Sequence, residues 1–276
     1  MKKTIILLFL TFSLFAQAQK TEVGVIAGVS LYSGDISPKE FGLFFQELQP
    51  AFGIFGRINP SRTFSARLSL SYTKLMADDF EVGIPERGLN FRTNLFEGEL
   101  MGEINIFRWG DSRRVEVVPF LTGGVGFFRF NPQGRLEDTW VDLQPLGTEG
   151  QGLPDYEAPY ELTQLNIPAG GGVKFIFNEQ WTLGLEFTGR KLFTDHLDDI
   201  SNASVYYLDV LEGNGQLAAQ FSNPNVKSPE EGDFTYTRGG QYMDWYFFGN
   251  ITLSFNIGRL SGVAGGRGIG CPNNDF

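Results

Sequence analysis

The amino-acid sequence predicts an all-β fold, an eight-stranded antiparallel up-and-down transmembrane β-barrel. Three observations predict it. Eight segments have the length of membrane-crossing strands, the connections between them alternate between short and long, and along most segments apolar and polar residues exchange at every step. About 9–11 tilted residues cross a bilayer as a strand. Outer-membrane barrels have an even number of strands, with short turns on the periplasmic side and long loops outside.

The eight predicted strands follow one another between residues 21 and 260. They occupy residues 22–32, 49–58, 63–77, 94–107, 115–130, 162–177, 181–191 and 242–257. The short connections are 59–62, 108–114 and 178–180. The long connections are 33–48, 78–93, 131–161 and 192–241. With an even number of strands, both ends of the barrel chain are expected on the short-turn side.

In the first four predicted strands, the separation of apolar residues on one face from polar residues on the other becomes clearer from the first strand to the fourth. Glycines fill several positions of the first two, and the second alternates Phe52 and Ile54 with Phe55 and Arg57. The third places Phe64, Ala66, Leu68, Leu70 and Tyr72 opposite Ser65, Arg67, Ser69 and Ser71. The fourth places Phe96, Leu100, Ile104 and Ile106 opposite Glu97, Glu99, Glu103 and Asn105. This two-residue period is that of strands with unlike environments on their two faces.

The last four predicted strands are less uniform. The fifth is apolar on both faces, so the sequence does not decide which row points inward. Glycines 170–172 interrupt the alternation of the sixth. The seventh places Trp181, Leu183, Leu185 and Phe187 opposite Thr182, Glu186, Thr188 and Arg190. The eighth places Ile251, Leu253, Phe255 and Ile257 opposite Asn250, Thr252, Ser254 and Asn256.

Alternation alone also fits a soluble, lipocalin-like barrel, in which the apolar rows would point inward. The polar rows of this chain, however, concentrate charges of both signs, and its 35 glycines suit bent strands and a tightly packed lumen. Aromatic residues also lie near strand ends, where membrane barrels carry interfacial girdles. These aromatics are Tyr32, Tyr72, Phe107, Trp181, Tyr242, Trp245 and Tyr246. The apolar rows are therefore predicted to face lipid.

The polar rows are then predicted to line the lumen. Eight strands enclose an interior that side chains just fill, and buried charges need partners. We therefore expect a lumen network of ion pairs. Its predicted members are Arg57, Arg67, Glu97, Glu99, Glu103, Lys174, Glu186 and Arg190. A conducting pore is the alternative, and the small number of strands argues against it.

The two ends of the chain predict export and a periplasmic tail. Residues 1–18 combine Lys2 and Lys3 with an apolar stretch and an A-x-A cleavage motif, as a secretory signal peptide does. Loss of those two lysines changes the formal charge from −10 to −12. Residues 19–260 would form the outer-membrane barrel, and residues 261–276 a Gly-rich tail available to a partner. Its predicted partner-binding residues are Arg267, Cys271 and Pro272. The single cysteine implies a free thiol or an intermolecular bridge.

The acidic charge argues against nucleic acid as a partner, because nucleic acids bind basic patches. Most acids fall in predicted loops, Asp198 and Asp199 among them, and are expected to form a solvated outer face. A cation site is the alternative. The chain lacks the cysteine and histidine spacing of zinc sites and the spaced loop of calcium sites. No metal, cofactor or catalytic residue is therefore predicted.

The single histidine offers the best starting point for an enzyme. His196 could pair with Ser201 or Ser204 in the long loop 192–241, as a lipid-hydrolysing outer-membrane enzyme would require. A lone loop histidine beside several aspartates is more often a surface residue, so a non-enzymatic protein is expected.

Several short motifs resemble the PorG family of outer-membrane barrels. They are the element Tyr32-Ser33-Gly34-Asp35-Ile36, the turn Arg57-Ile58-Asn59-Pro60, the strand end Glu103-Ile104-Asn105-Ile106-Phe107 and the tail motif Gly270-Cys271-Pro272. The resemblance extends over nearly all of the mature chain. It implies a structural role in type IX protein secretion and, in gliding species, in motility. The barrel would anchor a periplasmic ring of the lipoprotein PorK and the protein PorN to the outer membrane.

A general small barrel of the OmpA-like or OmpW-like kind is the alternative function. The long outer loops favour this hypothesis, which includes envelope integrity, adhesion or passage of a small solute. In either case the first expected partner is outer-membrane lipid.

Overall fold

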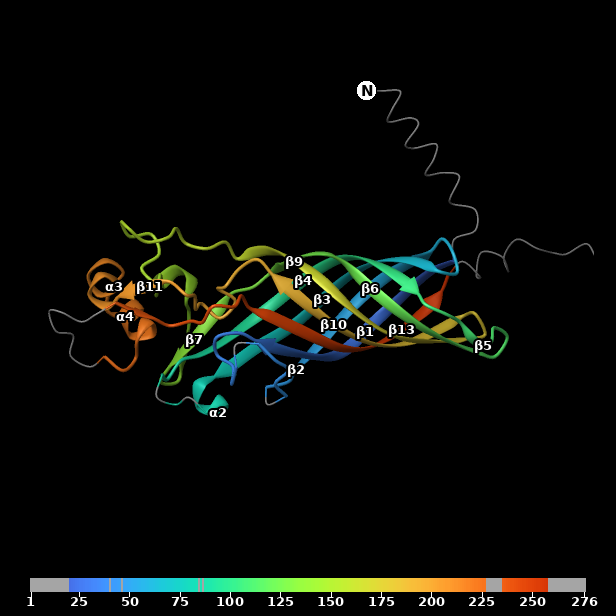
Figure 1. Ribbon diagram of the computed structural model, residues 1–276, viewed down its shortest axis with the longest axis horizontal. Coiled ribbons are helices and arrows are strands. Elements are labelled where there is room, and N and C mark those ends of the chain that lie inside the picture. The colour runs from blue at the N-terminus through green and yellow to red at the C-terminus, as the bar shows by residue number, and fades with distance from the viewer. Residues whose placement is uncertain are drawn as a thin grey trace, which may run out of the picture.

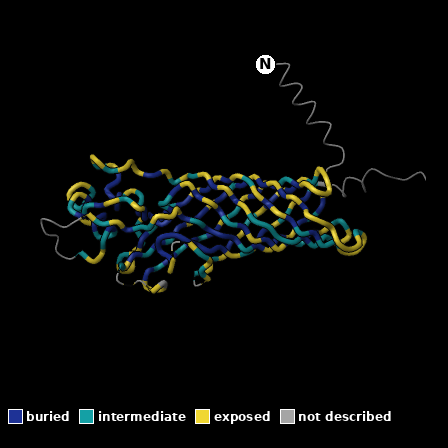
Figure 2. Tube along the Cα trace, viewed as in Figure 1, coloured by how far each residue is buried: buried dark blue, intermediate teal, exposed yellow. Residues whose placement is uncertain are grey.

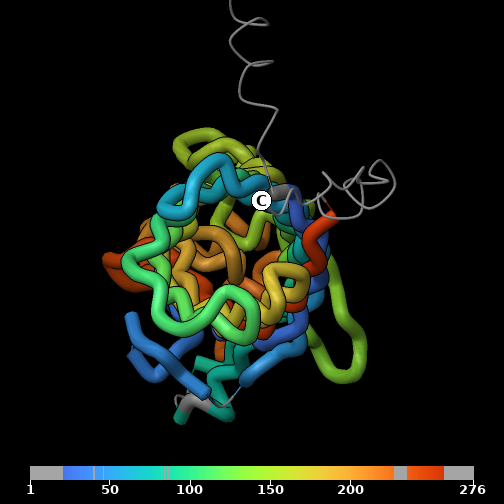
Figure 3. Tube along the Cα trace, turned by 90° about the vertical axis from the view of Figure 1, so that its right-hand side faces the viewer, coloured from blue at the N-terminus to red at the C-terminus, as the bar shows by residue number. Residues whose placement is uncertain are grey.

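In the computed structural model, which describes residues 20–257 apart from 40, 46, 84, 86 and 227–234, eight long strands close into an antiparallel barrel. Figure 1 shows the barrel from the side, and Figure 3, from the short-turn end, shows the closed ring. The strands are β1 (Lys20–Ser33), β2 (Gln49–Asn59), β3 (Phe64–Asp78), β4 (Asn90–Asn105), β6 (Val115–Arg129), β9 (Thr163–Phe177), β10 (Trp181–Leu192) and β13 (Trp245–Asn256). Each pairs with the next in that order, and β13 pairs with β1. The predicted fold class is confirmed.

The strand boundaries agree with the predicted ranges to within a few residues. The largest difference is in β4, which begins at Asn90 and ends at Asn105 instead of spanning 94–107. Its extra residues continue the pairing with β3 up to Asp78, so this hairpin extends beyond the outward-facing apolar residues of the two strands. Strand β13 begins at Trp245 and not at residue 242.

The outer surface of the barrel is apolar in alternating rows. Along most of the length of the barrel strands, inward residues that are more buried alternate with outward residues that are more exposed, which Figure 2 shows as alternating colours along the barrel wall. Leu68 and Phe127, for example, are each 61% exposed although they lie in the middle of the sheet. A closed barrel with an apolar exterior is the form in which strands cross a bilayer. The apolar rows are thus the lipid-facing rows, as predicted.

The structure also decides the orientation of the fifth long strand, β6. Val118, Phe120 and Phe128 are buried inside, whereas Leu121 and Phe127 face lipid. Near the turns, the inward Phe120 ring lies 4.4 Å from the ammonium group of Lys174. At the loop end, the inward Phe128 belongs to an apolar cluster that fills that half of the lumen. Only the folded barrel reveals this second apolar environment.

Two aromatics assigned to the interfacial girdle are instead inside the barrel. Tyr32 and Tyr246 are buried, and their neighbours Ser30 and Phe248 on the same rows are buried as well. The Tyr32 hydroxyl bonds to Asp198, and the Tyr246 hydroxyl bonds to Glu97. The prediction was wrong for these two because nearness to a strand end does not specify which face a tyrosine occupies.

The two ends of the barrel differ. At the short-turn end the only added element among the described residues is β5 (Trp109–Asp111), which pairs with the start of β6. The loop end carries a folded cap, seen at the left of Figure 1. Its elements are α2 (Asp79–Val82), β7 (Pro132–Leu136), β8 (Thr139–Asp142), the 3-10 helix η1 (Gln144–Leu146), β11 (Ser204–Tyr206), α3 (Tyr207–Gly213), α4 (Gln216–Ser222) and β12 (Thr235–Thr237). The sequence predicted only loops here.

The cap folds because it has an apolar core of its own. Val205, Tyr207, Val210, Ala218 and Ala219 are buried together, with other apolar side chains packed against them. No helix in the described part of the chain is long and apolar enough to cross a membrane. The predicted signal peptide 1–18 and tail 261–276 lie outside the described residues.

Candidate functional site

The lumen holds all eight residues of the predicted ion-pair network, and each of them is buried. They come from β2 (Arg57), β3 (Arg67), β4 (Glu97, Glu99 and Glu103), β9 (Lys174) and β10 (Glu186 and Arg190). The inward rows of neighbouring strands bring them together, since side chains two residues apart on a strand share a face.

Glu103 is the centre of the turn-side half of this network. Its carboxylate is fully buried and lies 3.0 Å from Nε of Arg57 and 3.5 Å from Nη1 of Arg67. The ammonium group of Lys174 also pairs with it, and donates to Oδ1 of Asn105 at 3.1 Å. Three cations therefore surround one buried carboxylate, which compensates for its loss of water.

The loop-side half of the network has two further arginine clusters. Arg67 makes a two-pronged contact with Glu186, with N···O distances of 2.6 and 2.8 Å. Arg190 lies 2.7 Å from Oε1 of Glu99 and 3.4 Å from Oε2 of Glu97. Paired arginine–carboxylate contacts of this kind are geometrically specific. The network is therefore a fixed structure that spans the barrel interior.

Two members of the network were missed from the sequence. Glu22 on β1 lies 3.0 Å from Nη1 of Arg57, and it accepts hydrogen bonds from Asn59 and Ser254. Tyr246 donates to Glu97 across 2.7 Å. The two-residue alternation along β1 could have assigned Glu22 to the lumen, because Glu22 lies on the same inward row as Ile26. That row consists mostly of small or apolar residues, which hid the signal.

An apolar stopper closes the lumen between the ion-pair network and the cap. We give this name to the buried cluster inside the loop end of the barrel. It comprises Tyr32, Ile36, Ala51, Leu75, Ala77, Leu89, Phe91, Leu95, Phe128, Phe130, Tyr160, Leu192, Leu197, Ile200, Tyr246 and Phe248. Edge-to-face contacts join several of its rings, such as Tyr32 and Phe91 with centroids 4.7 Å apart. A solute would have to displace close-packed side chains to pass.

The cap is locked above the stopper by a second set of buried charges. Arg238 lies 3.2 Å from Oε1 of Glu149, donates to Thr148 at 2.8 Å and contacts Asp199. The Tyr160 hydroxyl donates to Asp199 across 2.7 Å. Burial raises the pKa of Asp199 above its ordinary value, although the nearby Arg238 guanidinium acts in the opposite direction.

The expected solvated acidic face is therefore wrong for part of the last long loop. Asp198 and Asp199 are each only 1% exposed. They were expected in water because no pattern in the loop indicates that the cap folds and buries them. Other loop acids, such as Asp138 and Glu137, are exposed as expected.

His196 is not a surface residue either. Its ring stacks on Tyr160 with centroids 4.5 Å apart, and its Nδ1 lies 4.0 Å from Oε2 of Glu149. Ser201 donates its hydroxyl proton to the same carboxylate at 2.6 Å. Glu149, His196, Ser201 and Ser204 line a cavity of about 100 Å³. The serine is bonded to glutamate and not to histidine, so the nucleophile–base contact of a hydrolase is not formed.

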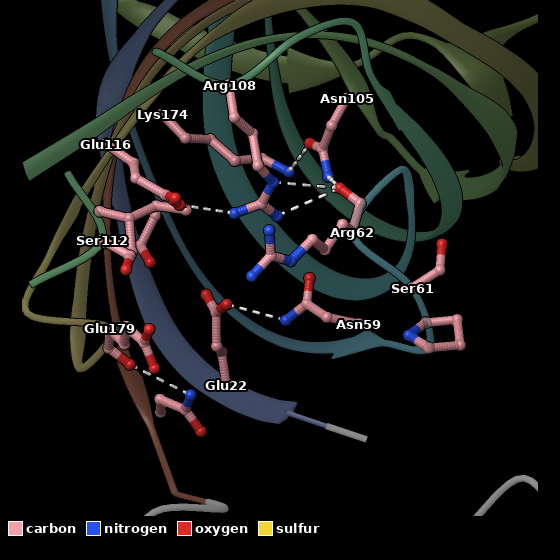
Figure 4. A pocket seen from close by; sticks show the side chains of 14 residues that line it. Glu22, Asn59, Ser61, Arg62, Asn105, Arg108, Ser112, Glu116, Lys174 and Glu179 are labelled. Carbon is pink, nitrogen blue, oxygen red and sulfur yellow. Dashed lines mark hydrogen bonds and ion pairs between the residues drawn. The ribbon is translucent and has the colours of Figure 1, made fainter. Parts of the chain in front are cut away.

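A vestibule opens from the short-turn end into the lumen. This cavity of about 300 Å³ is lined by Arg62 and Arg108 near its mouth and by Glu22 and Lys174 deeper inside. Figure 4 shows these side chains converging on the cavity, with Arg108 bonded to Glu116 at 2.7 Å. The vestibule ends at the ion-pair network.

The predicted partner-binding residues Arg267, Cys271 and Pro272 lie outside the described residues. Within residues that the structure does describe, no group of three or more His, Cys, Asp or Glu side chains could hold a metal ion. The geometry thus consists of a sealed lumen with a shallow vestibule on one side and a folded cap on the other.

Comparison with protein families gives one match. The model described as "Domain of unknown function (DUF6089)" matches residues 1–218. No curated protein matches the chain.

Solved structures with the same type of barrel are similar to this chain at low sequence identity. Neisserial surface protein A has a TM-score of 0.42 at 7% identity, covering 87% of this chain and 99% of its own. The N-terminal barrel of Pseudomonas aeruginosa OprF has a TM-score of 0.34 at 11% identity, with coverage of 87% and 99%. The attachment invasion locus protein Ail of Yersinia pestis, solved with a heparin analogue, has a TM-score of 0.34 at 9% identity, with coverage of 86% and 97%.

Proposed function

The chain belongs to the DUF6089 family, and we propose that it is a non-enzymatic, non-conducting β-barrel of the bacterial outer membrane with a structural role in the envelope. The sealed lumen is the observation that supports this proposal. The ion-pair network, the stopper and the cap lie one after another along the barrel axis. Transport of a solute would require breaking buried ion pairs, which costs several kcal/mol for each uncompensated charge.

The outer-membrane location is supported by the same features that define the barrel. Lipid-facing apolar rows alternate with lumen-facing polar rows, short turns lie at one end and long loops at the other. Barrels with this arrangement are typical of the bacterial outer membrane. Lipid is therefore the first partner that the molecule requires.

The absence of transport can be tested with the purified barrel in planar lipid bilayers. We expect no stepwise current at voltages at which a porin inserted in the same bilayer conducts. A variant that combines Phe91→Ala and Phe128→Ala opens part of the stopper and serves to show that a leak would be detected. Regular conductance steps from the native protein would contradict the proposal.

An envelope role can be separated from adhesion by complementation of a deletion strain. One plasmid encodes the native chain, and a second encodes a variant in which a short glycine–serine connection replaces residues 202–241 of the cap. If the barrel itself supports the envelope, both restore resistance to detergent. If the cap mediates adhesion, only the native chain restores attachment to surfaces. Failure of the native chain to change either property would argue against both roles.

As a second candidate we propose the PorG-like function, anchoring of a PorK- and PorN-like periplasmic ring in type IX secretion. The supporting observation is the short-turn end, which exposes Arg62, Arg108, Arg113 and Arg114 around an open vestibule. The loop end, in contrast, carries most of the acids among the residues that the structure describes. This asymmetry is suited to a periplasmic partner with an acidic surface.

Deletion of residues 262–276 tests the anchoring role. The barrel should still insert, but secretion of cargo and recovery of ring proteins with the tagged barrel should be lost. The narrower hypothesis of an intermolecular disulfide predicts that Cys271→Ser removes a cross-linked band from non-reducing gels. Unchanged secretion in the deletion strain would leave the general envelope role as the better proposal.

A further inference from the structure

The outward-facing charged side chains of the barrel strands are confined to the loop end. Among those that the structure describes, the cations are Lys74 on β3, Arg92 on β4, Arg129 on β6 and Lys191 on β10, and the one acid is Asp78 at the end of β3. The turn-side halves of the same rows carry no described charge. For a chain with a formal charge of −10, a nearly all-cationic outer rim is unexpected.

The cations begin where the apolar belt ends. Tyr72 is paired with Phe96, and Phe96 is paired with Arg129, so these three side chains form one row across β3, β4 and β6. Lys74 stands two residues beyond Tyr72, beside Asn94. Two strand spacings, roughly 10 Å, separate β3 from β6. The long side chains of Lys74 and Arg129 can therefore reach the same headgroup at the membrane surface.

The protein itself does not neutralise this rim. Within the described residues no ion pair engages Lys74, Arg129 or Lys191. The acid of the rim, Asp78, lies 3.6 Å from Arg135, a cap residue.

Arg92 is held in place without an ion pair. Its guanidinium lies 4.1 Å above the Trp140 ring and donates to Gln133 at 2.9 Å. Asp142 accepts hydrogen bonds from Asn131 and Gln133 on the cap side of this contact. The charge of Arg92 is thus oriented by an aromatic face at the rim.

The remaining part of the circumference is covered by apolar chain. Residues 41–45 lie outside β1, where the Gly42 amide donates to Ser33 at 3.0 Å. The Phe41 ring packs 5.5 Å from Trp245 and 6.2 Å from Phe247 on β13. The cations are therefore gathered on the side from β3 to β10 and are absent where this segment covers the wall.

We propose that Lys74, Arg92, Arg129 and Lys191 bind the phosphate groups of an anionic glycolipid in the outer leaflet of the membrane. This inference rests on the proposed outer-membrane location. Phosphates at the headgroup level meet cations that face outward at the edge of the hydrocarbon, and several cations on neighbouring strands match a headgroup with more than one phosphate. The Tyr72 and Phe96 rings would contact the acyl chains directly below.

Lipid retention by the full-length barrel in neutral detergent tests the proposal. Bisphosphorylated lipid A is added, and the bound fraction is measured by native mass spectrometry. The rim variant combines Lys74→Gln, Arg129→Gln and Lys191→Gln. The control variant makes the same charge change at the short-turn end with Arg62→Gln, Arg113→Gln and Arg114→Gln. We expect the rim variant to bind at least about tenfold more weakly and the control to bind like the native protein.

Binding measurements with two further lipids test the specificity of the site. Dephosphorylated lipid A and phosphatidylglycerol should each be retained more weakly than bisphosphorylated lipid A by the native barrel. Equal binding by the native and rim variants, or equal binding of the dephosphorylated lipid, would overturn the proposal. Equal retention of phosphatidylglycerol would overturn the assignment to glycolipid.

The variants are compared only after folding has been checked by heat-modifiability on gels. The single variant Arg129→Gln, at an exposed position, replaces the triple variant if the latter does not fold. If the native barrel fractionates with the outer membrane but retains all the tested lipids equally, this inference alone is contradicted. If the barrel is recovered outside the outer membrane, both this inference and the proposed function are contradicted.

Discussion

Tyr32 and Asp198 are joined by a 2.6 Å hydrogen bond from the tyrosine hydroxyl to Oδ2 of the aspartate, across 166 positions of the chain. The same hydroxyl lies 3.2 Å from Oδ1 of Asp244, and both carboxyls are buried. A tyrosine hydroxyl has one proton to donate and can accept another. The arrangement therefore suits one ionised and one protonated carboxyl that share Tyr32.

The other charged groups near this cluster do not remove the conflict between the two carboxyls. Asp35 and Asp195 add negative charge, and Arg87 pairs mainly with Asp79 at 2.6 Å. Burial, followed by the charge of Asp35, raises the pKa of Asp198 well above its ordinary value. Burial, followed by the charges of Asp198 and Asp35, does the same to the pKa of Asp244.

The cap should therefore loosen as the pH rises. The folded state holds a proton that the unfolded segment releases, so stability declines from the ordinary carboxyl pKa, about 4, up through the raised values. The amides of Leu197 and Ile200 donate to Asp244 and Asp198 and are suitable reporters. After correction for intrinsic exchange rates, we expect both amides to exchange more slowly at pH 5 than at pH 8 in hydrogen-exchange measurements.

An Asp244→Asn variant should reduce this pH dependence, because the asparagine stays neutral across the range. Asp138→Asn, at an exposed position in the β7–β8 hairpin, is the matched control and should leave it unchanged. Equal protection of the two amides at both pH values in the native protein would contradict the shared-proton arrangement.

Replacement of Glu103 by glutamine should destabilise the barrel itself. The change leaves Arg57, Arg67 and Lys174 in the lumen with one carboxylate fewer. Removal of one partner from a buried ion pair typically costs about 3–5 kcal/mol. The free energy of unfolding can be measured in urea and detergent from tryptophan fluorescence. Asp138→Asn should stay within about 0.5 kcal/mol of the native protein, and an equally small effect of Glu103→Gln would mean that the network does not stabilise the barrel.

The barrel could be predicted from the sequence because its signal is local. When one face of a strand meets lipid and the other meets packed charges, apolar and polar residues alternate along the strand itself, as in β3 and β4. Charged residues on the polar rows, such as Arg67 and Glu103, were found for the same reason. Residues whose rows lack that contrast were missed, as Glu22 was, or were assigned to the wrong side, as Tyr246 was.

The cap could not be predicted because its elements are short and depend on distant partners. Helices of seven residues, such as α3 and α4, are marginal without tertiary packing. The burial of Asp199 depends on Arg238, which comes from the far end of the same loop. No local pattern in the sequence distinguishes that aspartate from one in water.

Replacement of Arg238 by methionine should release the cap and leave the barrel intact. Arg238 contacts Glu149 and Asp199 and donates to the carbonyl of Phe221 at 3.1 Å, so it joins three separate segments. Loss of the guanidinium leaves two buried carboxylates unpaired, at a local cost of about 3–5 kcal/mol. We expect faster hydrogen exchange throughout residues 197–226 with an unchanged urea midpoint for the barrel.

Arg135→Met is the control for this variant, since the Arg135 side chain is 48% exposed and its ion pair with Asp78 is 3.6 Å long. Surface pairs of this kind contribute about 0–1 kcal/mol. If exchange in the cap is equally slow in both variants, the Arg238 contacts are not what holds the cap.

Glycines on the two faces of the barrel should respond in opposite ways to alanine. A Cβ on Gly172, which faces the lumen, would collide with the backbone oxygen of Leu185, so β9 and β10 would have to move apart. Overpacking of this kind typically costs about 1–3 kcal/mol. A Cβ on Gly56, which faces lipid, meets nothing within 4 Å. There the alanine should be neutral or should stabilise by up to about 1 kcal/mol, because it restricts the unfolded chain. The free energy of unfolding of both variants can be measured in urea. We expect the changes relative to the native protein to differ in sign or by at least about 1 kcal/mol. If Gly172→Ala were as stable as Gly56→Ala, the close approach of β9 to β10 would not be the reason for a glycine in the lumen wall.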